Sequence, residues 1–518
     1  MKQLTTFLFA AVATLGFGQT WSDNVASIVY NKCATCHHDG GIAPTPLMAY
    51  TDVSPMASAM YDAINDDVMP PWPPDNNYQQ YSHSRSLSPV EKSTMLAWLD
   101  NGYPEGNSAN TPPPPVFNEG SILGNGDLIV QIPTYMSKAD THDDYVCFSV
   151  PVGLAQNRTI RAIEVVPGNR AIVHHALIYV DETGTYVTDT IGGDCMGPDA
   201  TLIGGYTPGA TPQVFPSGVG FKLGMDIPVG SNIVFGMHYP LGTYGMYDST
   251  KVIFHFYPTN EVGIRQVTAD AILQNWALSL PPNQVTPATA QYGGANGLPV
   301  DISVLSVFPH MHLLGKTIKA YAINAQGDTI KYVNVHDWDF HWQDFYFFQH
   351  IQKTPVGSVL HAEATFDNTT NNPENPSNPP VHVYAGENTT DEMMLVYFHY
   401  LLYQPGDENY DLESLMSVGI TELSNENNGD WNVYPVPFSD QLTINNEELQ
   451  EGDRVSVYIY DFQGKLIKQL ANQTVISNDF TGFVWDGTND QGTAAAKGSY
   501  MVSMNRNGGF SSTTVLKQ

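Results

Sequence analysis

The chain has 518 residues and a formal net charge of −31, with 52 acidic against 21 basic side chains. This length exceeds what one hydrophobic core supports, so we expect several domains. The acidic balance argues against nucleic acid and anionic membranes as partners, because both require a basic surface. Only 14% of the residues are charged, and Asn, Thr, Gly and Pro are abundant, which is typical of a loop-rich, β-rich exported protein.

The first residues predict an export signal. Lys2 precedes the apolar run LTTFLFAAVATLGFG, and the small residues Gly16 and Gly18 fit a cleavage site before Gln19. This pattern predicts a secretory signal peptide over residues 1–18, whose apolar run is too short for a comfortable membrane span. No later segment of the sequence approaches about 18 uninterrupted apolar residues, the length that a membrane-spanning helix needs. We therefore expect a secreted or cell-surface protein without a transmembrane segment in its mature form.

Residues 20–106 carry helix signals. In the stretch SPVEKSTMLAWLDNG, Ser88 fits an N-cap, a proline follows it, and Glu91 completes a capping box. Gly102 marks the end of this helix. The stretch TPPPPVF then predicts a stiff, extended linker within residues 107–124.

Two of the four cysteines lie in the stretch NKCATCHHDGG. Cys33, Cys36 and His37 form the spacing C-x-x-C-H, which is used to attach c-type haem. The two thiols add to the haem vinyl groups, and the adjacent imidazole binds the iron. A redox C-x-x-C pair or a structural disulfide would not require the histidine. We therefore predict one c-type haem held by these three side chains.

The second axial ligand of that haem is less defined by the sequence. Met69 lies in the proline-bounded stretch DDVMPPW, and a thioether is a common axial ligand. We choose Met69, although methionines often only fill cores. The alternatives are Met48, Met56, Met60 and His83. The C-x-x-C-H motif followed by MPPW resembles a small, helical mono-haem cytochrome c domain, which would span residues 20–106.

From residue 125 to 422 the sequence changes to short strand-like segments separated by Gly, Pro and Asn. Examples are DLIVQIP, TIRAIEVV, HHALIYV, NIVFGMHYP, KVIFHFY, SVLHAEATF and MMLVYFHYLLY. This pattern is typical of antiparallel sandwiches, and roughly 300 residues are enough for two of them. We expect one sandwich over residues 125–262 and another over residues 263–422.

Five histidines gather in three places of this region: His174 with His175, His238, and His310 with His312. Strand residues two apart share a face, about 6.6 Å apart at a rise of roughly 3.3 Å per residue, so His310 and His312 can bind one ion. Adjacent His174 and His175 face opposite sides of a regular strand, so the strand must end or twist there if both bind one metal. A single strand histidine is usually solvated or buried without a ligand, but two pairs and a singleton favour metal binding.

The types of ligand narrow the choice of metal. Imidazole binds zinc, copper, iron and nickel, whereas a thioether selects Cu(I). The sequence has no H-E-x-x-H motif of a zinc hydrolase. Four segments occur in order: an H-H pair, an M-H-Y strand, H-x-H-L-L-G-K and TTDEMMLVYF. Together they resemble the type II copper-, ascorbate-dependent monooxygenases, the family of peptidylglycine α-hydroxylating and dopamine β-monooxygenase, over roughly residues 125–422.

The resemblance implies two antiparallel, jelly-roll-like β-sandwiches, each holding one copper ion across a solvent-filled cleft. It implies an electron-transfer copper bound by His174, His175 and His238, and a catalytic copper bound by His310, His312 and Met393. Met393 is preferred to Met394 because the family motif ends on its methionine ligand, and because neighbouring strand residues face opposite sides.

The resemblance also bears on covalent bonds and on the substrate. Cys147 and Cys195 stand where it implies a disulfide, which would contribute roughly 4 kcal/mol in the chain-entropy model. Peptide-hydroxylating members hold the substrate carboxylate with arginine, asparagine and tyrosine; the matching positions here are Phe308, Leu395 and Tyr397. Only the tyrosine remains, so an apolar or aromatic substrate fits better than a peptide with a C-terminal glycine.

The activity that the resemblance implies is hydroxylation of a substrate C–H bond with O2 at the catalytic copper. Tyr397 is carried over as a further residue of that catalytic site, at the position that holds the substrate in the family. The electrons would come through the other copper from ascorbate or a redox protein. Because the chain also carries a haem motif, we hypothesise that the N-terminal domain feeds electrons to the coppers. The alternatives are an electron-transfer or copper-binding protein without oxygenase activity, and a surface adhesin whose histidines are incidental.

A polar break over residues 423–431 precedes a final module over residues 432–518. Its stretches VYPVPFSDQLTI, VSVYIYDFQGKLIKQL and WDGTNDQGTAAAKGSYMVSM resemble the C-terminal sorting domain of type IX secretion cargo, although the usual YPNP reads YPVP. The resemblance implies a small β-sandwich that is recognised by the type IX secretion machinery. The alternative is an ordinary carbohydrate- or surface-binding sandwich.

Overall fold

The computed structural model describes residues 18–39, 41, 43, 45–115, 121–124, 126–191, 200–207, 210–218, 220–386, 389–416, 431–446, 449–461, 466–475, 482–506 and 509–517. The expected signal peptide lies outside the described residues except for Gly18, and the expected linker over 423–431 lies outside them except for Trp431. The chain forms two compact units, one of Met1–Trp72 with Ser84–Phe117 and one of Pro73–His83 with Asn118–Gln518.

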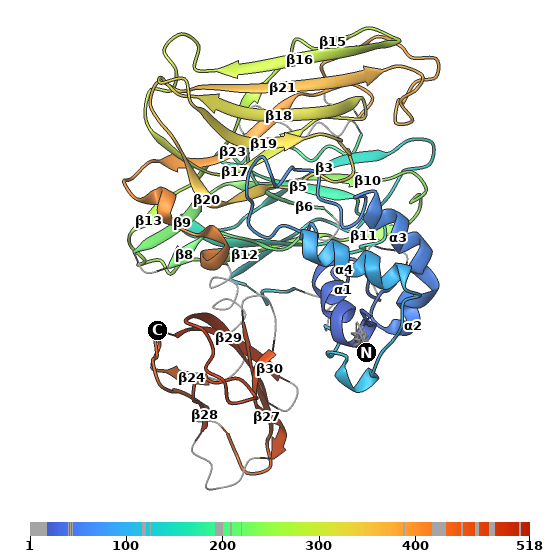
Figure 1. Ribbon diagram of the computed structural model, residues 1–518. Helices are drawn as coiled ribbons and strands as arrows, with labels where there is room; N and C mark the ends of the chain where they lie inside the picture. Colours follow the sequence, from blue (N-terminus) through green and yellow to red (C-terminus); the bar gives the residue numbers. More distant parts are fainter. Residues whose placement is uncertain are drawn as a thin grey trace, which may run out of the picture. The chain divides into compact units, whose positions relative to one another are not determined.

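The first unit is helical. Its elements are η1 (Trp21–Val25), α1 (Ala26–Lys32), α2 (Tyr50–Val53), η2 (Ser54–Met56), α3 (Ala57–Asn65), α4 (Pro89–Asp100) and η3 (Ser108–Asn110) (Figure 1). The capping box of α4 forms as expected: Ser88 Oγ accepts from the Glu91 N–H at 3.2 Å, and Glu91 Oε2 accepts from the Ser88 N–H at 2.7 Å. Buried Trp21 and Trp98, with ring centroids 6.2 Å apart, centre the core.

The expected helical domain over residues 20–106 is interrupted, because residues 73–83 belong to the second unit. Tyr81 is buried there and forms an isolated bridge with Phe348. Its hydroxyl donates to the Tyr332 carbonyl oxygen at 2.9 Å. The helical unit is therefore built from the residues on either side of this segment.

The first sandwich has two sheets. One has the order β1-β12-β4-β9-β13 with β7 and β8 beside it, and comprises β1 (Leu128–Gln131), β4 (Arg158–Val166), β7 (Gln213–Val214), β8 (Ser217–Gly218), β9 (Phe221–Ile227), β12 (Lys251–Phe256) and β13 (Ile264–Gln266). The other has the order β3-β10-β5-β6, with β3 (Asp144–Pro151), β5 (His175–Asp181), β6 (Ala200–Tyr206) and β10 (Asn232–Tyr239). A further pair joins β2 (Tyr135–Met136) to β11 (Tyr247–Asp248). Because β13 pairs with β9, this sandwich runs past the expected boundary at 262.

The second sandwich is also built of two antiparallel sheets. One has the order β14-β23-β17-β20, with β14 (Thr268–Gln274), β17 (Ile302–His310), β20 (Tyr346–Thr354) and β23 (Leu395–Leu402). The other has the order β16-β21-β18-β19, with β16 (Gln284–Tyr292), β18 (Gly315–Ile323), β19 (Thr329–Val335) and β21 (Val359–Asn368). The short pair β15 (Ser279–Leu280) and β22 (Val383–Tyr384) and the 3-10 helix η4 (Asp407–Asn409) complete it. The expected β-sandwich fold class is confirmed for this region.

The two sandwiches share a buried interface. Val234 of β10 and Tyr179 of β5 pack in one cluster with Phe345 and Tyr397 of the second sandwich. Phe235, the next residue on β10, lies instead in the main core. Since strand residues alternate between faces, β10 is buried on both sides, as all eight of its residues are. This burial explains the continuous apolar run NIVFGMHY in place of an alternating pattern.

The C-terminal module has a three-stranded sheet of β24 (Trp431–Tyr434), β25 (Leu442–Asn446) and β28 (Phe483–Trp485). Its four-stranded sheet has the order β27-β26-β29-β30, with β26 (Arg454–Asp461), β27 (Leu466–Val475), β29 (Gly498–Arg506) and β30 (Gly509–Lys517). Phe438, Ile459 and Trp485 lie in its core. The module is a compact β structure, and the DFQGK motif lies outside the described residues beyond Asp461.

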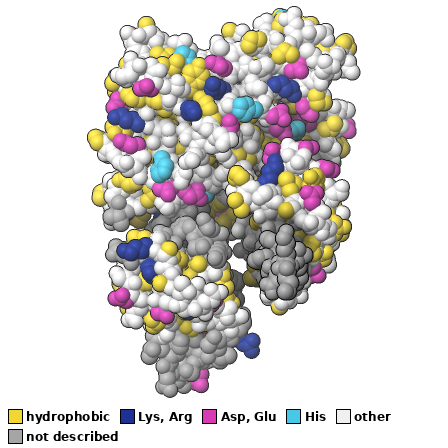
Figure 2. All heavy atoms as spheres, viewed as in Figure 1, with side chains coloured by type: hydrophobic (Ala, Val, Ile, Leu, Met, Phe, Trp, Pro, Cys, Tyr) yellow, Lys and Arg dark blue, Asp and Glu magenta, His cyan; other side chains and the backbone are white. Residues whose placement is uncertain are grey.

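The acidic side chains do not gather in one patch on the face that Figure 2 shows; they are spread over it between other polar surface. Among the described residues, no helix combines the length and the apolar character needed to cross a membrane.

Candidate metal centres

Three imidazoles converge at one end of the β5–β10 pair. In the antiparallel register of these strands, His175 lies directly opposite His238. The strand β5 begins at His175, so His174 stands just outside it, and its backbone N–H donates to the His238 carbonyl oxygen at 3.0 Å. Adjacent histidines can share an ion only where a strand ends or twists. The first residue of β5 is His175, so His174 lies beyond the terminus of the strand, as that requirement predicts.

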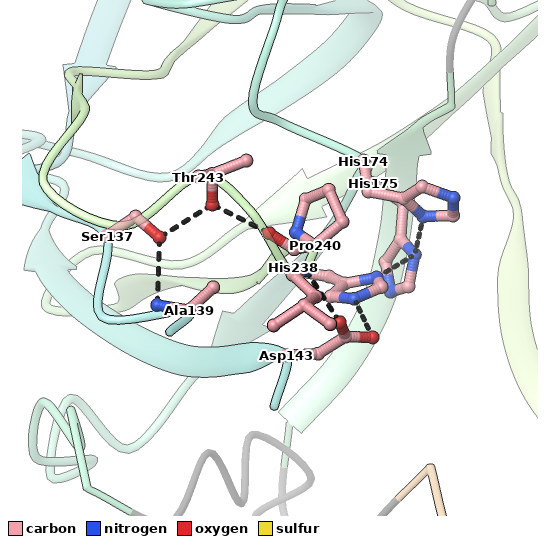
Figure 3. A network of polar contacts seen from close by, with 9 residues as sticks. Ser137, Ala139, Asp143, His174, His175, His238, Pro240 and Thr243 are labelled. Carbon is pink, nitrogen blue, oxygen red and sulfur yellow. Dashed lines mark hydrogen bonds and ion pairs between the residues drawn. The ribbon is translucent and has the colours of Figure 1, made fainter. Parts of the chain in front are cut away.

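The nitrogen atoms of this first histidine cluster, His174, His175 and His238, lie within 4.8 Å of one another. The Nδ1 atom of His175 is 3.3 Å from Nδ1 of His174 and 3.4 Å from Nδ1 of His238. Figure 3 shows the rings turned toward one another. Three imidazole nitrogens at this spacing can bind one transition-metal ion such as copper or zinc.

A carboxylate orients the third imidazole. His238 Nε2 is 2.9 Å from Asp143 Oδ2. Because a carboxylate only accepts, Nε2 carries the proton and Nδ1 presents its lone pair to the cluster, as in carboxylate–histidine–metal sites. Asp143 is held in turn by the N–H of Leu241 at 2.8 Å, and the Tyr145 ring stacks on His238 at 4.3 Å. This hydrogen bonding keeps the pKa of Asp143 below its usual value, although burial acts in the opposite direction.

Burial keeps the imidazoles of the cluster neutral. Burial and the neighbouring His238 lower the pKa of His174 to about 3. Burial also places the pKa of His175 well below its usual value, and it lowers the pKa of His238 although Asp143 acts in the opposite direction. Neutral imidazoles keep the lone pairs that bind a metal, so the cluster can bind an ion at neutral pH.

The second histidine pair lies at the end of β17. His310 is the last residue of that strand, and His312 follows in the next turn with its ring centroid 5.2 Å from that of His310. His310 Nδ1 donates to Gln343 Oε1 at 2.6 Å, and His312 Nδ1 donates to the Asp391 carbonyl oxygen at 3.1 Å. These partners assign the proton to Nδ1 on both rings and leave both Nε2 atoms as potential ligands.

The segment containing Met393 is tied to this pair through Glu392. The fully buried Glu392 carboxylate accepts N–H groups from His312 at 2.9 Å and Leu314 at 2.7 Å. It also accepts the N–H of Met393 at 3.0 Å. Burial raises the pKa of Glu392 to about 8, while these hydrogen bonds act in the opposite direction. The carboxylate thereby fixes the backbone of one expected ligand against that of another.

The choice between Met393 and Met394 does not follow from strand alternation. Both residues precede β23, which begins at Leu395, and both side chains are buried. The preference for Met393 therefore rests on the family motif alone.

The solvent-filled cleft that we expected between the two histidine groups stays a prediction, but one side chain lies close to both groups. The buried Phe340 ring lies 6.3 Å from His175 and 6.4 Å from His238 between centroids. It is 5.9 Å from His312 of the other group. An aromatic side chain thus contacts both groups, because the packed sheets bring the loop that carries it over the end of β5 and β10.

One family model matches the second sandwich: copper type II ascorbate-dependent monooxygenase, C-terminal domain, over residues 272–427. The match supports the copper monooxygenase family. At the level of that family, the match supports a copper-dependent oxidoreductase. The matched residues include His310, His312 and Met393. A second model, the FlgD Ig-like domain, matches residues 440–509 in the C-terminal module.

Comparisons with whole proteins add little. No match was found among curated proteins. Among solved structures, PorZ, a surface component of the type IX secretion system of Porphyromonas gingivalis, is 22% identical over 24% of this chain and 14% of its own, with a TM-score of 0.14. An infectious bursal disease virus structure, of the Gx strain, is 10% identical over 56% of this chain and 76% of its own, with a TM-score of 0.15. TM-scores this low carry no argument about fold.

The C-x-x-C-H residues lie in a tight turn, and their binding of a haem stays a prediction. The N–H groups of Cys36 and His37 both donate to the Cys33 carbonyl oxygen, at 3.1 and 3.0 Å, which forms a tight turn. The two thiols are free rather than joined as a disulfide. His37 Nδ1 donates to the Thr45 carbonyl oxygen at 2.8 Å, so its Nε2 retains the lone pair that would bind iron.

Three of the candidates for the second axial ligand lie as follows. His83 lies in the other unit, where its Nδ1 pairs with Glu413 at 2.9 Å. Met60 is part of the buried helical core. Met69 follows α3 in a half-buried loop, with its N–H donating to the Ala63 carbonyl oxygen at 3.0 Å. Met69 remains our prediction.

The expected disulfide and substrate residues lie as follows. Cys147 is buried in β3, but Cys195 lies outside the described residues, so their pairing stays a prediction. Phe308 precedes His310 on the same face of β17, with its ring 4.8 Å from Phe345 and 6.0 Å from Tyr397 between centroids. An aromatic wall therefore adjoins the second pair.

Sequence reasoning missed Asp143 and Gln343, which orient imidazoles, and Glu392, which holds the backbone at His312 and Met393. The signal for Glu392 was available, since it stands within the DEM motif beside the expected ligand. Asp143 and Gln343 are distant in sequence from the histidines they contact, so only the folded chain reveals them.

We predict that Glu392→Gln destabilises the second pair. A glutamine side chain can accept the His312 and Met393 N–H groups with its one oxygen, which leaves an NH2 group facing the N–H of Leu314. An unsatisfied buried donor costs about 1–3 kcal/mol, so the free energy of unfolding, measured with denaturant above pH 8 where Glu392 is ionised, should fall by that amount. Copper affinity, measured by competition with a chelator, should also fall.

The matched control is Glu363→Gln, which alters a solvent-exposed carboxylate of the same sandwich that accepts from Tyr321 at 2.7 Å. It should leave both measurements unchanged. Equal unfolding midpoints and copper affinities for both variants would contradict the positioning role of Glu392.

Proposed function

We propose that the chain is a secreted copper-dependent monooxygenase that hydroxylates a C–H bond of a small substrate with O2. The single observation that carries the proposal is the pair of histidine groups, one in each sandwich, in which oxygen acceptors assign the nitrogen lone pairs of His238, His310 and His312. The family match over the second sandwich supports it at the level of copper monooxygenases.

The two groups have different donor sets, which suits different tasks. His174, His175 and His238 offer imidazole nitrogen alone. His310 and His312 lie beside the segment of Met393, whose thioether would favour Cu(I). Copper held by these residues would supply one-electron redox chemistry toward O2. The overall reaction consumes one O2, two electrons and two protons, and yields one hydroxylated product and one water.

The residues around the second pair have recognisable tasks in this reaction. Gln343 and the Asp391 carbonyl oxygen hold the two imidazoles in one tautomer and orientation. Phe308 adjoins His310, Tyr397 adjoins Phe308, and the two rings offer an aromatic wall. Such a wall favours an apolar or aromatic substrate, since burial of apolar surface would contribute most of the binding energy.

The deciding variant is Met393→Ala, which removes the thioether and leaves the imidazoles. With copper, ascorbate and a panel of C–H substrates, we expect substrate-dependent O2 uptake and product formation to fall at least about tenfold. His382→Ala, an exposed histidine of the same sandwich, is the control and should keep the full rate.

Copper that binds without substrate-dependent O2 uptake in the unaltered chain would instead favour an electron-transfer or copper-binding protein. Absence of bound copper would favour a surface adhesin.

We further propose that the N-terminal unit binds one c-type haem through Cys33, Cys36 and His37, with Met69 as second axial ligand, and passes electrons to the coppers. The free thiols and the His37–Thr45 hydrogen bond support the haem. Three one-electron centres in a single polypeptide support the electron path.

Rapid mixing of the reduced holoprotein with O2 and substrate tests this path. We expect the haem absorbance to change from reduced to oxidised at the rate of product formation, and Cys36→Ala, which weakens haem attachment, to slow turnover when electrons enter through the haem. A haem that stays reduced while product accumulates would contradict the electron path.

Export is the last part of the proposal: a signal peptide over residues 1–18 and type IX sorting through residues 432–518. The sequence resemblance of the C-terminal module supports it. Deletion of residues 432–518 should leave the protein inside the outer membrane, as measured by cell fractionation. Unchanged release of the truncated chain would contradict the sorting role.

A further inference from the structure

The loop between β19 and β20 brings another imidazole to the first histidine cluster. The centroid of the His341 ring lies 5.2 Å from that of His174. Within the cluster itself, the ring centroids are 4.7 to 5.5 Å apart. His341 is therefore as close to His174 as the cluster members are to one another, although it belongs to the other sandwich.

The tautomer of His341 leaves a lone pair for a metal. Asp339 Oδ1 accepts the backbone N–H of His341 at 2.8 Å and lies 2.9 Å from its Nδ1. Since the carboxylate only accepts, Nδ1 carries the proton and Nε2 has the lone pair. Asp143 likewise accepts a hydrogen bond from His238, but from the other ring nitrogen, Nε2. A carboxylate partner of this kind is typical of metal-binding histidines.

The loop is fixed on both sides of His341. Before it, the Trp338 N–H donates to the Lys316 carbonyl oxygen at 2.9 Å, and Trp338 Nε1 donates to the His312 carbonyl oxygen at 3.2 Å. After it, Gln343 bonds both His310 and the Phe340 carbonyl oxygen, at 2.6 and 2.7 Å. The position of His341 therefore follows from the packing of the second sandwich.

We propose that His341 is a fourth imidazole ligand of the metal bound at His174, His175 and His238. The proposal rests on the metal binding that the proposed function requires. Four nitrogen ligands suit the tetragonal geometry of Cu(II). Because His341 comes from the second sandwich, one ion would join the two sandwiches.

A histidine that is half-exposed and paired with aspartate can also be a simple surface ion pair, since the His341 side chain is 50% exposed. The experiment must therefore detect coordination itself. The full chain carrying His310→Ala and His312→Ala leaves the first site as the copper site to be measured. Copper(II) sulfate is titrated against a chelator, and the electron paramagnetic resonance spectrum is recorded.

In this background we expect His341→Ala to lower Cu(II) affinity about ten- to hundredfold and to change the copper hyperfine splitting. Added imidazole should restore the original spectrum, which a merely structural role would not allow. His382→Ala is the control and should alter neither quantity. Thermal unfolding of the metal-free variants, expected to be equal, checks that the fold is intact.

Two failures are distinguishable. If His341→Ala leaves the affinity and the spectrum unchanged while His238→Ala removes both, the inference is wrong and the proposed function stands. If the background protein binds no Cu(II) at all, both the inference and the copper site of the proposed function are wrong.

Discussion

The register between β5 and β10 is the constraint on which the first cluster depends. It sets His175 opposite His238, and the hydrogen bond from the His174 N–H to the His238 carbonyl oxygen turns the preceding residue toward the same point. A shift of one residue would reverse the face of every side chain on the strand. Because β10 is buried on both faces, the close fit of its side chains in two different cores, Phe235 in one and Val234 in the other, opposes such a shift.

Packing of the two sandwiches through their sheets explains why the two histidine groups lie near one another. The sheet with β10 meets the sheet with β17, and each strand delivers its histidines at its end. The loop between β19 and β20 then serves both groups. Gln343 orients His310, Phe340 lies against rings of both, and His341 reaches His174. A substitution in this loop would therefore alter both histidine groups.

Much of this arrangement was predictable because the signals are local. The capping box at Ser88 and the strand segments follow from spacing along the chain, and the grouping of His174, His175 and His238 was implied by the family resemblance. What sequence could not give were contacts between distant segments. Residues 73–83 pack on the second sandwich because of side chains such as Tyr81, whose partners lie far along the chain. The contacts of Phe340 with both histidine groups have the same origin.

The burial of the imidazoles in these groups has a free-energy cost that hydrogen bonds and a bound ion would offset. Buried imidazoles that point lone pairs at one another gain nothing from that contact in the absence of an ion, and their burial without full hydrogen bonding costs free energy. The structure offsets this cost at the outer nitrogens, where Asp143 and Gln343 accept from His238 and His310. An ion that binds the folded chain but not the unfolded one would add its binding energy to stability. The same features that orient the ligands therefore make folding and metal binding mutually supportive.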